Sequence, residues 1–139
     1  MLFASPDDVT SLQKDVAAQV KALTASIGDC IKAGTIRPSD GAPTDPGIFR
    51  EWKAMAKRVT LFLNEEPNWV DANTQYDRGL AIQKDLQPWY DRINAAGCKA
   101  PTKPAPPAAG PKGEAWGEGW AELVGLALLA FALHEAKGL

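Results

Sequence analysis

Residues 5–34 read SPDDVTSLQKDVAAQVKALTASIGDCIKAG, and this stretch decides the fold class. Ser5 is a good helix N-cap, Pro6 suits the first helical position, and the next two aspartates place carboxylates beside free backbone amides. Apolar residues then recur in steps of three or four, which keeps them on one face of a helix; they are Val9, Leu12, Val16, Val20, Leu23, Ile27 and Ile31. Gly34 is a natural stop, so the stretch predicts one long amphipathic helix.

Two further periodic runs follow a loop at residues 34–46 that is rich in proline and glycine. The first starts at Asp45-Pro46, a second cap-plus-proline signal, and ends at about Asn64. The second extends from near Asp71 to Gly97, and Pro88 inside it predicts a kink or break near residues 85–87. The apolar positions are Ile48, Phe49, Trp52, Met55, Ala56, Val59, Phe62 and Leu63, then Tyr76, Gly79, Leu80, Ile82, Leu86, Trp89, Tyr90 and Ile93.

These patterns predict an all-α protein, because no stretch alternates as a strand does. Residues 1–98 are expected to form an up-down-up three-helix bundle whose core holds the aromatic residues of the second and third helices. Residues 99–113 read as a proline-rich linker, and residues 114–139 as a separate apolar C-terminal helix. The sequence therefore predicts one domain, a spacer and a detached helix.

The two cysteines fall at the ends of helices that should meet. Cys30 lies in the last turn of the first helix, and Cys98 follows the end of the third. In an up-down-up bundle these ends share a pole, which predicts a disulfide; two unpaired thiols are the alternative. A disulfide implies an oxidising compartment or the outside of a particle, although MLFASPDD at the N-terminus shows no signal-peptide pattern.

The C-terminal segment reads EAWGEGWAELVGLALLAFALHEAKGL over residues 114–139. Its uncharged run of 11 residues, Leu123–Leu133, would make about 16 Å of helix, too short to cross a bilayer of ~30 Å. Extension from Trp116 to His134 gives 19 residues and about 28 Å but includes two glutamates. The residues expected to contact a membrane or an assembly are Trp116, Gly117, Trp120, Ala121, Gly125, Leu129 and Phe131.

Three environments suit this segment: a membrane or its edge, a groove in a protein partner, or the surface of its own bundle. Gly117, Ala121 and Gly125 are spaced by four, so one side of the helix permits close approach of another helix. The positive-inside tendency is in conflict with the disulfide. More lysines precede the segment than follow it, which favours a cytoplasmic bundle, whereas a disulfide favours the outside.

Charge and composition exclude several classes of function. The 15 Lys and Arg against 17 Asp and Glu leave a formal charge of -2, which provides no field to bind nucleic acid. With one histidine, His134, and two distant cysteines, the chain offers no metal cluster and no histidine-based triad in its main body. No cofactor or small-molecule substrate is indicated. Trp69, between the second and third helices, is either an exposed contact residue or a plug over one end of the bundle.

The sequence thus favours a non-enzymatic structural or adaptor protein that the C-terminal helix anchors to a membrane or a large assembly. Its partners would be proteins of that assembly, with membrane contact through residues 114–139 and a membrane-associated or virion location. A minor structural protein of a virus particle is consistent with a disulfide in a chain that shows no signal-peptide pattern. The alternatives are an accessory subunit of a cellular membrane complex, with reduced cysteines, and a lysis or toxin protein that permeabilises membranes.

Overall fold

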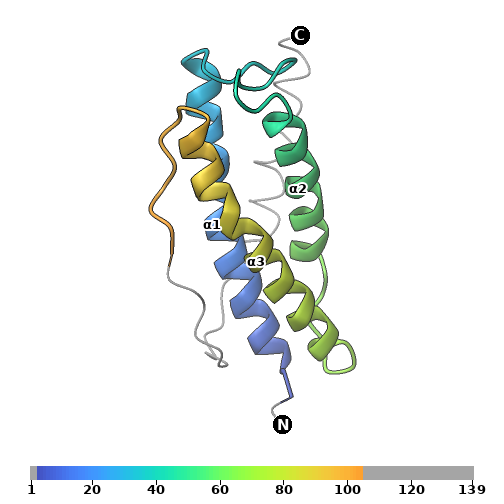
Figure 1. Cartoon of the computed structure of the whole chain (residues 1–139). Helices are drawn as coiled ribbons and strands as arrows, with labels where there is room; N and C mark the ends of the chain where they lie inside the picture. Colours follow the sequence, from blue (N-terminus) through green and yellow to red (C-terminus); the bar gives the residue numbers. More distant parts are fainter. Residues whose placement is uncertain (1–2, 105–139) are drawn as a thin grey trace.

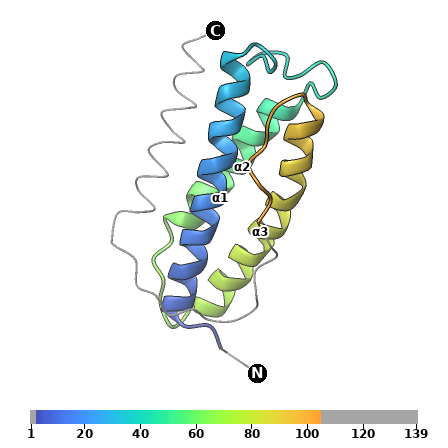
Figure 2. The same ribbon diagram turned by 90° about the vertical axis from the view of Figure 1, so that its left-hand side faces the viewer.

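The computed structural model describes residues 3–104, which form three helices joined by two loops (Figure 1). The helices are α1 (Pro6–Lys32), α2 (Ile48–Leu63) and α3 (Ala72–Ala95). The chain rises through α1, descends through α2 and rises again through α3, and each helix contacts the other two (Figures 1 and 2). Over residues 3–104 the only β-type pairing is two isolated bridges in the α1–α2 loop. The prediction of an all-helical fold is confirmed for this part of the chain.

The start and end of α1 follow the signals in its sequence. Ser5 is the N-cap: its hydroxyl accepts a bond from the Asp8 amide at 3.2 Å, and the Asp8 carboxylate accepts one from the Ser5 amide at 2.8 Å. This reciprocal pair is a capping box, which satisfies two otherwise free amides. Gly34, just beyond the helix, has a φ of 78°, a conformation that glycine adopts without steric cost.

The core lies along the apolar stripe of α1. Val9, Val16, Val20, Leu23 and Ile27 are fully buried, as are Phe49, Trp52 and Phe62 of α2 and Ile82, Leu86 and Ile93 of α3. The rings of Trp52 and Trp89 meet edge to face with centroids 5.0 Å apart, an arrangement favoured by aromatic quadrupoles. The predicted aromatic core is confirmed, with Tyr76 partly buried at its edge.

The predicted start of α2 at Asp45-Pro46 is wrong by two to three residues. The helix begins at Ile48, its N-cap is Gly47, and no side chain bonds to its first amides. Asp45 is occupied elsewhere: its backbone pairs with Ala42, and its carboxylate accepts two hydrogen bonds from Arg92 of α3. A partner distant in sequence therefore takes the carboxylate that the local pattern assigns to capping.

Of the kink or break predicted near Pro88, the break is wrong, because α3 continues through that proline as one helix of 24 residues; the kink stays a prediction. A proline inside a helix removes one amide donor and crowds the carbonyl one turn earlier, at a cost of about 3 kcal/mol. Leu86, Trp89, Tyr90 and Ile93 are buried on both sides of Pro88. Their burial holds this part of α3 in helical form despite the local penalty.

Gly79 lets the three helices approach one another. It lies on the buried face of α3, and a Cβ atom placed there would lie 2.6 Å from Phe62 Cζ of α2 and closer still to the Leu12 side chain of α1. Glycine is otherwise unfavourable within a helix by up to about 1 kcal/mol relative to alanine. Close packing, rather than backbone conformation, accounts for glycine at this position.

We therefore expect Gly79→Ala to destabilise the bundle by about 1–3 kcal/mol, because overpacking outweighs the gain in helix propensity. The matched control is Thr74→Ala at an exposed position of the same helix, which should change the free energy of unfolding by less than about 0.5 kcal/mol. Urea unfolding followed by circular dichroism measures both. A stabilised Gly79→Ala protein would contradict the close packing.

After Gly97 the chain turns back and runs down beside α3 (the orange segment in Figures 1 and 2). The Ala100 amide donates to Asn94 Oδ1 at 3.0 Å, and Lys103 Nζ lies 3.6 Å from the Asp91 carboxylate. These residues are the described part of the expected linker at 99–113. The expected C-terminal helix at 114–139 lies outside the described residues, and within residues 3–104 no helix has the length and apolar character of a membrane span.

Candidate functional site

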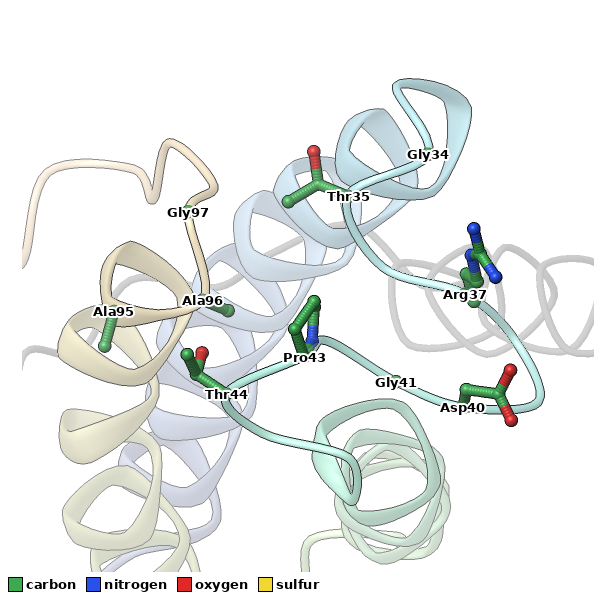
Figure 3. A pocket seen from close by; sticks show the side chains of 10 residues that line it. All are labelled: Gly34, Thr35, Arg37, Asp40, Gly41, Pro43, Thr44, Ala95, Ala96 and Gly97. Carbon is green, nitrogen blue, oxygen red and sulfur yellow. The ribbon is translucent and has the colours of Figure 1, made fainter.

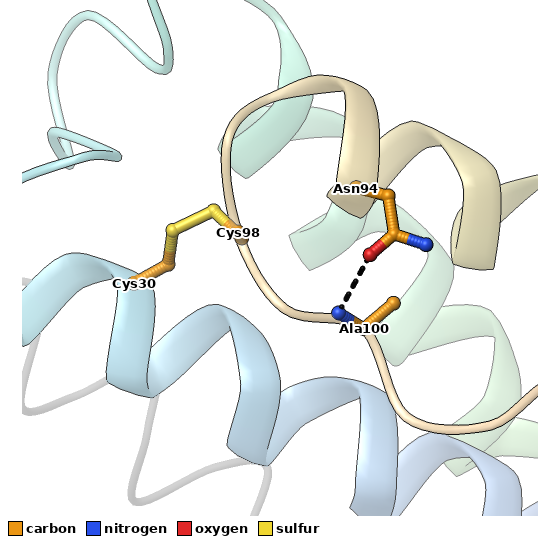
Figure 4. Close-up of a disulfide and its surroundings, with 4 residues drawn as sticks. All are labelled: Cys30, Asn94, Cys98 and Ala100. Atoms are coloured by element: carbon orange, nitrogen blue, oxygen red, sulfur yellow. Dashed lines mark hydrogen bonds between the residues drawn. A yellow bond between two sulfur atoms is a disulfide. The ribbon is translucent and has the colours of Figure 1, made fainter.

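The disulfide joins the end of α1 to the chain just beyond α3 (Figure 4). Cys30 and Cys98 have Cα atoms 5.7 Å apart, within the usual range for a disulfide. Gly97, at a φ of 92°, turns the chain toward α1, and the Cys98 amide donates to the Ile93 carbonyl at 3.1 Å. The pairing inferred from helix directions is confirmed. The alternative, two unpaired thiols, is wrong for this structure.

We expect the Cys30→Ser/Cys98→Ser double variant to lose about 4 kcal/mol of unfolding free energy, the chain-entropy value for a cross-link across 68 residues. Denaturant unfolding measures the loss, with the reduced wild-type protein as the matched control, which should unfold with the variant. Mass spectrometry after alkylation without reductant should find both cysteines protected. Alkylation of both would contradict the cross-link.

An ion-pair cluster centred on Arg92 lies at the same end of the bundle. Its guanidinium donates to both Asp45 carboxylate oxygens, at 2.5 and 2.8 Å, and to Glu51 Oε2 at 2.7 Å. It also lies 4.5 Å from the ring centroid of Trp89, in position for a cation–π contact. Arg92 thus ties α3 to the α1–α2 loop and to the first turn of α2.

The contacts within the cluster shift the pKa values of all three groups. The side-chain hydrogen bond from Arg92 lowers the pKa of Asp45 below its usual 3.8, and burial of Asp45 opposes that shift. The same type of bond lowers the pKa of Glu51. The hydrogen bond to Asp45 raises the pKa of Arg92, so the guanidinium stays charged. These groups stabilise one another and hold no proton for transfer near neutral pH.

The stability from this cluster should depend on pH. Because both carboxyl pKa values are lower in the folded chain, the contribution is complete above their usual values of 3.8 and 4.5 and is lost as the pH falls through the lowered ones. Arg92→Met should cost about 2 kcal/mol at neutral pH, and the difference from wild type should shrink toward about pH 2.5. Urea unfolding across this range measures it.

The matched control is Arg58→Met, which removes an exposed pair with Asp85 on the flank of the bundle. It should cost less than about 1 kcal/mol, as exposed pairs do. An equal loss for Arg92→Met at both ends of the pH range would contradict the role of the carboxylates.

A hollow of about 670 Å³ opens at the same end of the bundle, between the α1–α2 loop and the end of α3 (Figure 3). Most of its lining is glycine, alanine, threonine and proline, with Arg37 and Asp40 at one side. Its lining residues include no histidine, cysteine or second carboxylate. Nor do residues 3–104 contain a group of three or more potential metal-ligating side chains of His, Cys, Asp or Glu.

The opposite end of the bundle exposes large apolar side chains. We call it the Trp69 pole; it consists of residues 3–5, the α2–α3 loop at residues 64–71 and the first turn of α3. Trp69 is 76% exposed, Val70 is 93% exposed and Phe3 is 72% exposed. The interpretation of Trp69 as a plug over the bundle is therefore wrong, and a contact role remains the alternative.

Two buried glutamines hold the loop of the Trp69 pole in place. Gln13 of α1 donates to the carbonyls of Phe62 and Glu65, at 3.0 and 2.9 Å. Gln75 of α3 donates to the Glu66 carbonyl at 2.9 Å. Sequence reasoning missed both, although a glutamine beside an apolar helical stripe is a signal that a buried amide needs a partner.

The Asn68 side chain accepts a bond from the Asp71 amide at 2.8 Å and donates to the Glu66 carbonyl at 3.1 Å. Arg78 forms an ion pair with Glu65. The backbone on both sides of Trp69 is thus fixed by side chains from three elements.

The structure brings together some of the residues singled out in the sequence and separates others. Cys30 and Cys98 meet at one end, and Trp69 lies at the other. The remaining predicted contact residues lie outside the described residues; they are Trp116, Gly117, Trp120, Ala121, Gly125, Leu129 and Phe131.

Comparison of the chain with protein-family models, with curated proteins and with solved structures finds no match.

Proposed function

We propose that the chain is a non-enzymatic structural or adaptor protein, in which a disulfide-stapled bundle is attached to a membrane or a larger assembly through residues 114–139. The observation that supports this most directly is the fixed path of the chain where it leaves the bundle. Cys98 is bonded covalently to α1, and Ala100 and Lys103 are tied to α3. The segment that follows therefore starts from a defined point.

Several features of the bundle suit such a role. One core cluster joins residues of all three helices with Ile36 and Ala42 of the α1–α2 loop, so the body is a single packed unit. The Arg92 cluster and the disulfide reinforce one end. These features support a mechanical or scaffolding role.

The disulfide also bears on the setting. Disulfides persist in oxidising surroundings and are rare in reducing cytosol. A virus particle outside its host cell is such a setting, so the proposal includes a minor structural protein of a virion. An accessory subunit of a cellular membrane complex with its bundle in the cytosol agrees less well with a disulfide-bonded bundle.

Fractionation of two chains tests the proposal. The full chain should sediment with membranes or with a large complex, whereas a chain ending at Lys112 should remain in the supernatant. Carbonate and detergent extraction then separate membrane insertion from protein assembly. Circular dichroism with non-reducing mass spectrometry is the control that both chains contain the folded, oxidised bundle. Equal solubility and a monomeric state for both chains would contradict attachment through residues 114–139.

A further inference from the structure

We infer that the Trp69 pole docks on a protein surface that has an apolar pocket with basic groups around it, and that this partner belongs to the assembly reached by the C-terminal segment. The inference rests on the proposed function for its setting. The inference itself is based on three observations: exposed apolar side chains on an ordered loop, acidic residues around them, and the direction of residues 98–104.

Trp69 and Val70 project from a loop that is already ordered. Gln13, Gln75 and Asn68 bond to its backbone, so the loop has little conformational freedom to lose on binding. Tryptophan is among the residues that most often dominate the binding energy of protein interfaces. An exposed tryptophan beside an exposed valine on an ordered loop is thus suited to enter a complementary pocket.

The charge around Trp69 and Val70 indicates which kind of partner, a protein or a lipid bilayer, this surface fits. Residues 59–77 contain no lysine or arginine, and Asp7, Glu66 and Asp71 are exposed at the same end. The nearby cation, Arg78, is paired with Glu65. Negative charge is repelled by anionic lipid headgroups, whereas it complements lysines and arginines around a pocket. The pole therefore fits a basic-rimmed protein site better than a bilayer.

The described part of the chain beyond α3 runs toward the same pole. Residues 98–104 run back along α3 from the Asn94 contact to the Asp91 contact, away from the disulfide and toward the end of the bundle that carries Trp69 (Figures 1 and 2).

Photo-crosslinking tests the inference in the intact chain. A benzophenone amino acid replaces Trp69 in the full chain, expressed in its source cells, and the matched control carries the same group at exposed Lys57 on α2. We expect a discrete protein adduct from position 69 and none from position 57. Lipid adducts at 69, no adduct, or the same adduct from both positions would overturn the inference.

The cross-linked partner is then purified and its affinity for the full chain measured. Trp69→Ala should weaken binding at least tenfold while leaving the free energy of unfolding within about 0.5 kcal/mol of wild type, because the side chain is exposed. Glu66→Gln/Asp71→Asn should weaken binding and flatten its salt dependence, and Lys57→Ala should leave it unchanged. Unaltered affinity in Trp69→Ala would overturn the docking site.

Binding to lipid vesicles tests the alternative that the Trp69 pole contacts a bilayer. Trp69-dependent binding of the full chain to phosphatidylcholine vesicles, equal to or stronger than its binding to the partner, would assign the pole to a bilayer and overturn the inference. The two proposals fail separately. If the Lys112 truncation fractionates like the full chain but still forms the position-69 adduct, the anchor is wrong and the docking site stands.

Discussion

Burial of a single apolar stripe on α1 is the constraint on which the rest of the molecule depends. The helix is 27 residues long, about 40 Å at ~1.5 Å per residue, and its stripe is buried from Val9 to Cys30. α2 and α3 make their more extensive contacts with α1 and fewer with each other. Each therefore takes its position from α1, and Gly79 of α3 leaves space for the side chains of Leu12 and Phe62.

The two ends of the bundle are stabilised by different chemistry. At one end a covalent bond and a guanidinium shared by two carboxylates join all three helices and the α1–α2 loop. At the other, neutral amide side chains bond to backbone carbonyls and leave Trp69 and Val70 exposed. Strong constraints thus lie away from the exposed apolar surface. The exposed carboxylates at the Trp69 pole include Asp7, Glu66 and Asp71, whereas Glu65 is paired with Arg78.

The sequence was informative where local chemistry and global packing agree. The Ser5 cap, the stripe of α1 and the positions of the two cysteines follow from spacing and helix direction alone. Asp45 was misassigned because its partner, Arg92, lies 47 residues away and leaves no local signal. The Pro88 break was expected because the local penalty is visible in the sequence and the burial that offsets it is not. Exposure of Trp69 depends on the fixed path of a loop, which periodicity does not describe.

The disulfide has a mechanical consequence. A pulling force applied at residue 104 reaches Cys98 and passes through the sulfur atoms to Cys30, near the end of α1, instead of peeling α3 from its last turn. The force therefore enters α1 near its C-terminal end, through the helix whose apolar stripe is central to the core. Tension applied at residue 104 is therefore carried by α1 as well as by α3.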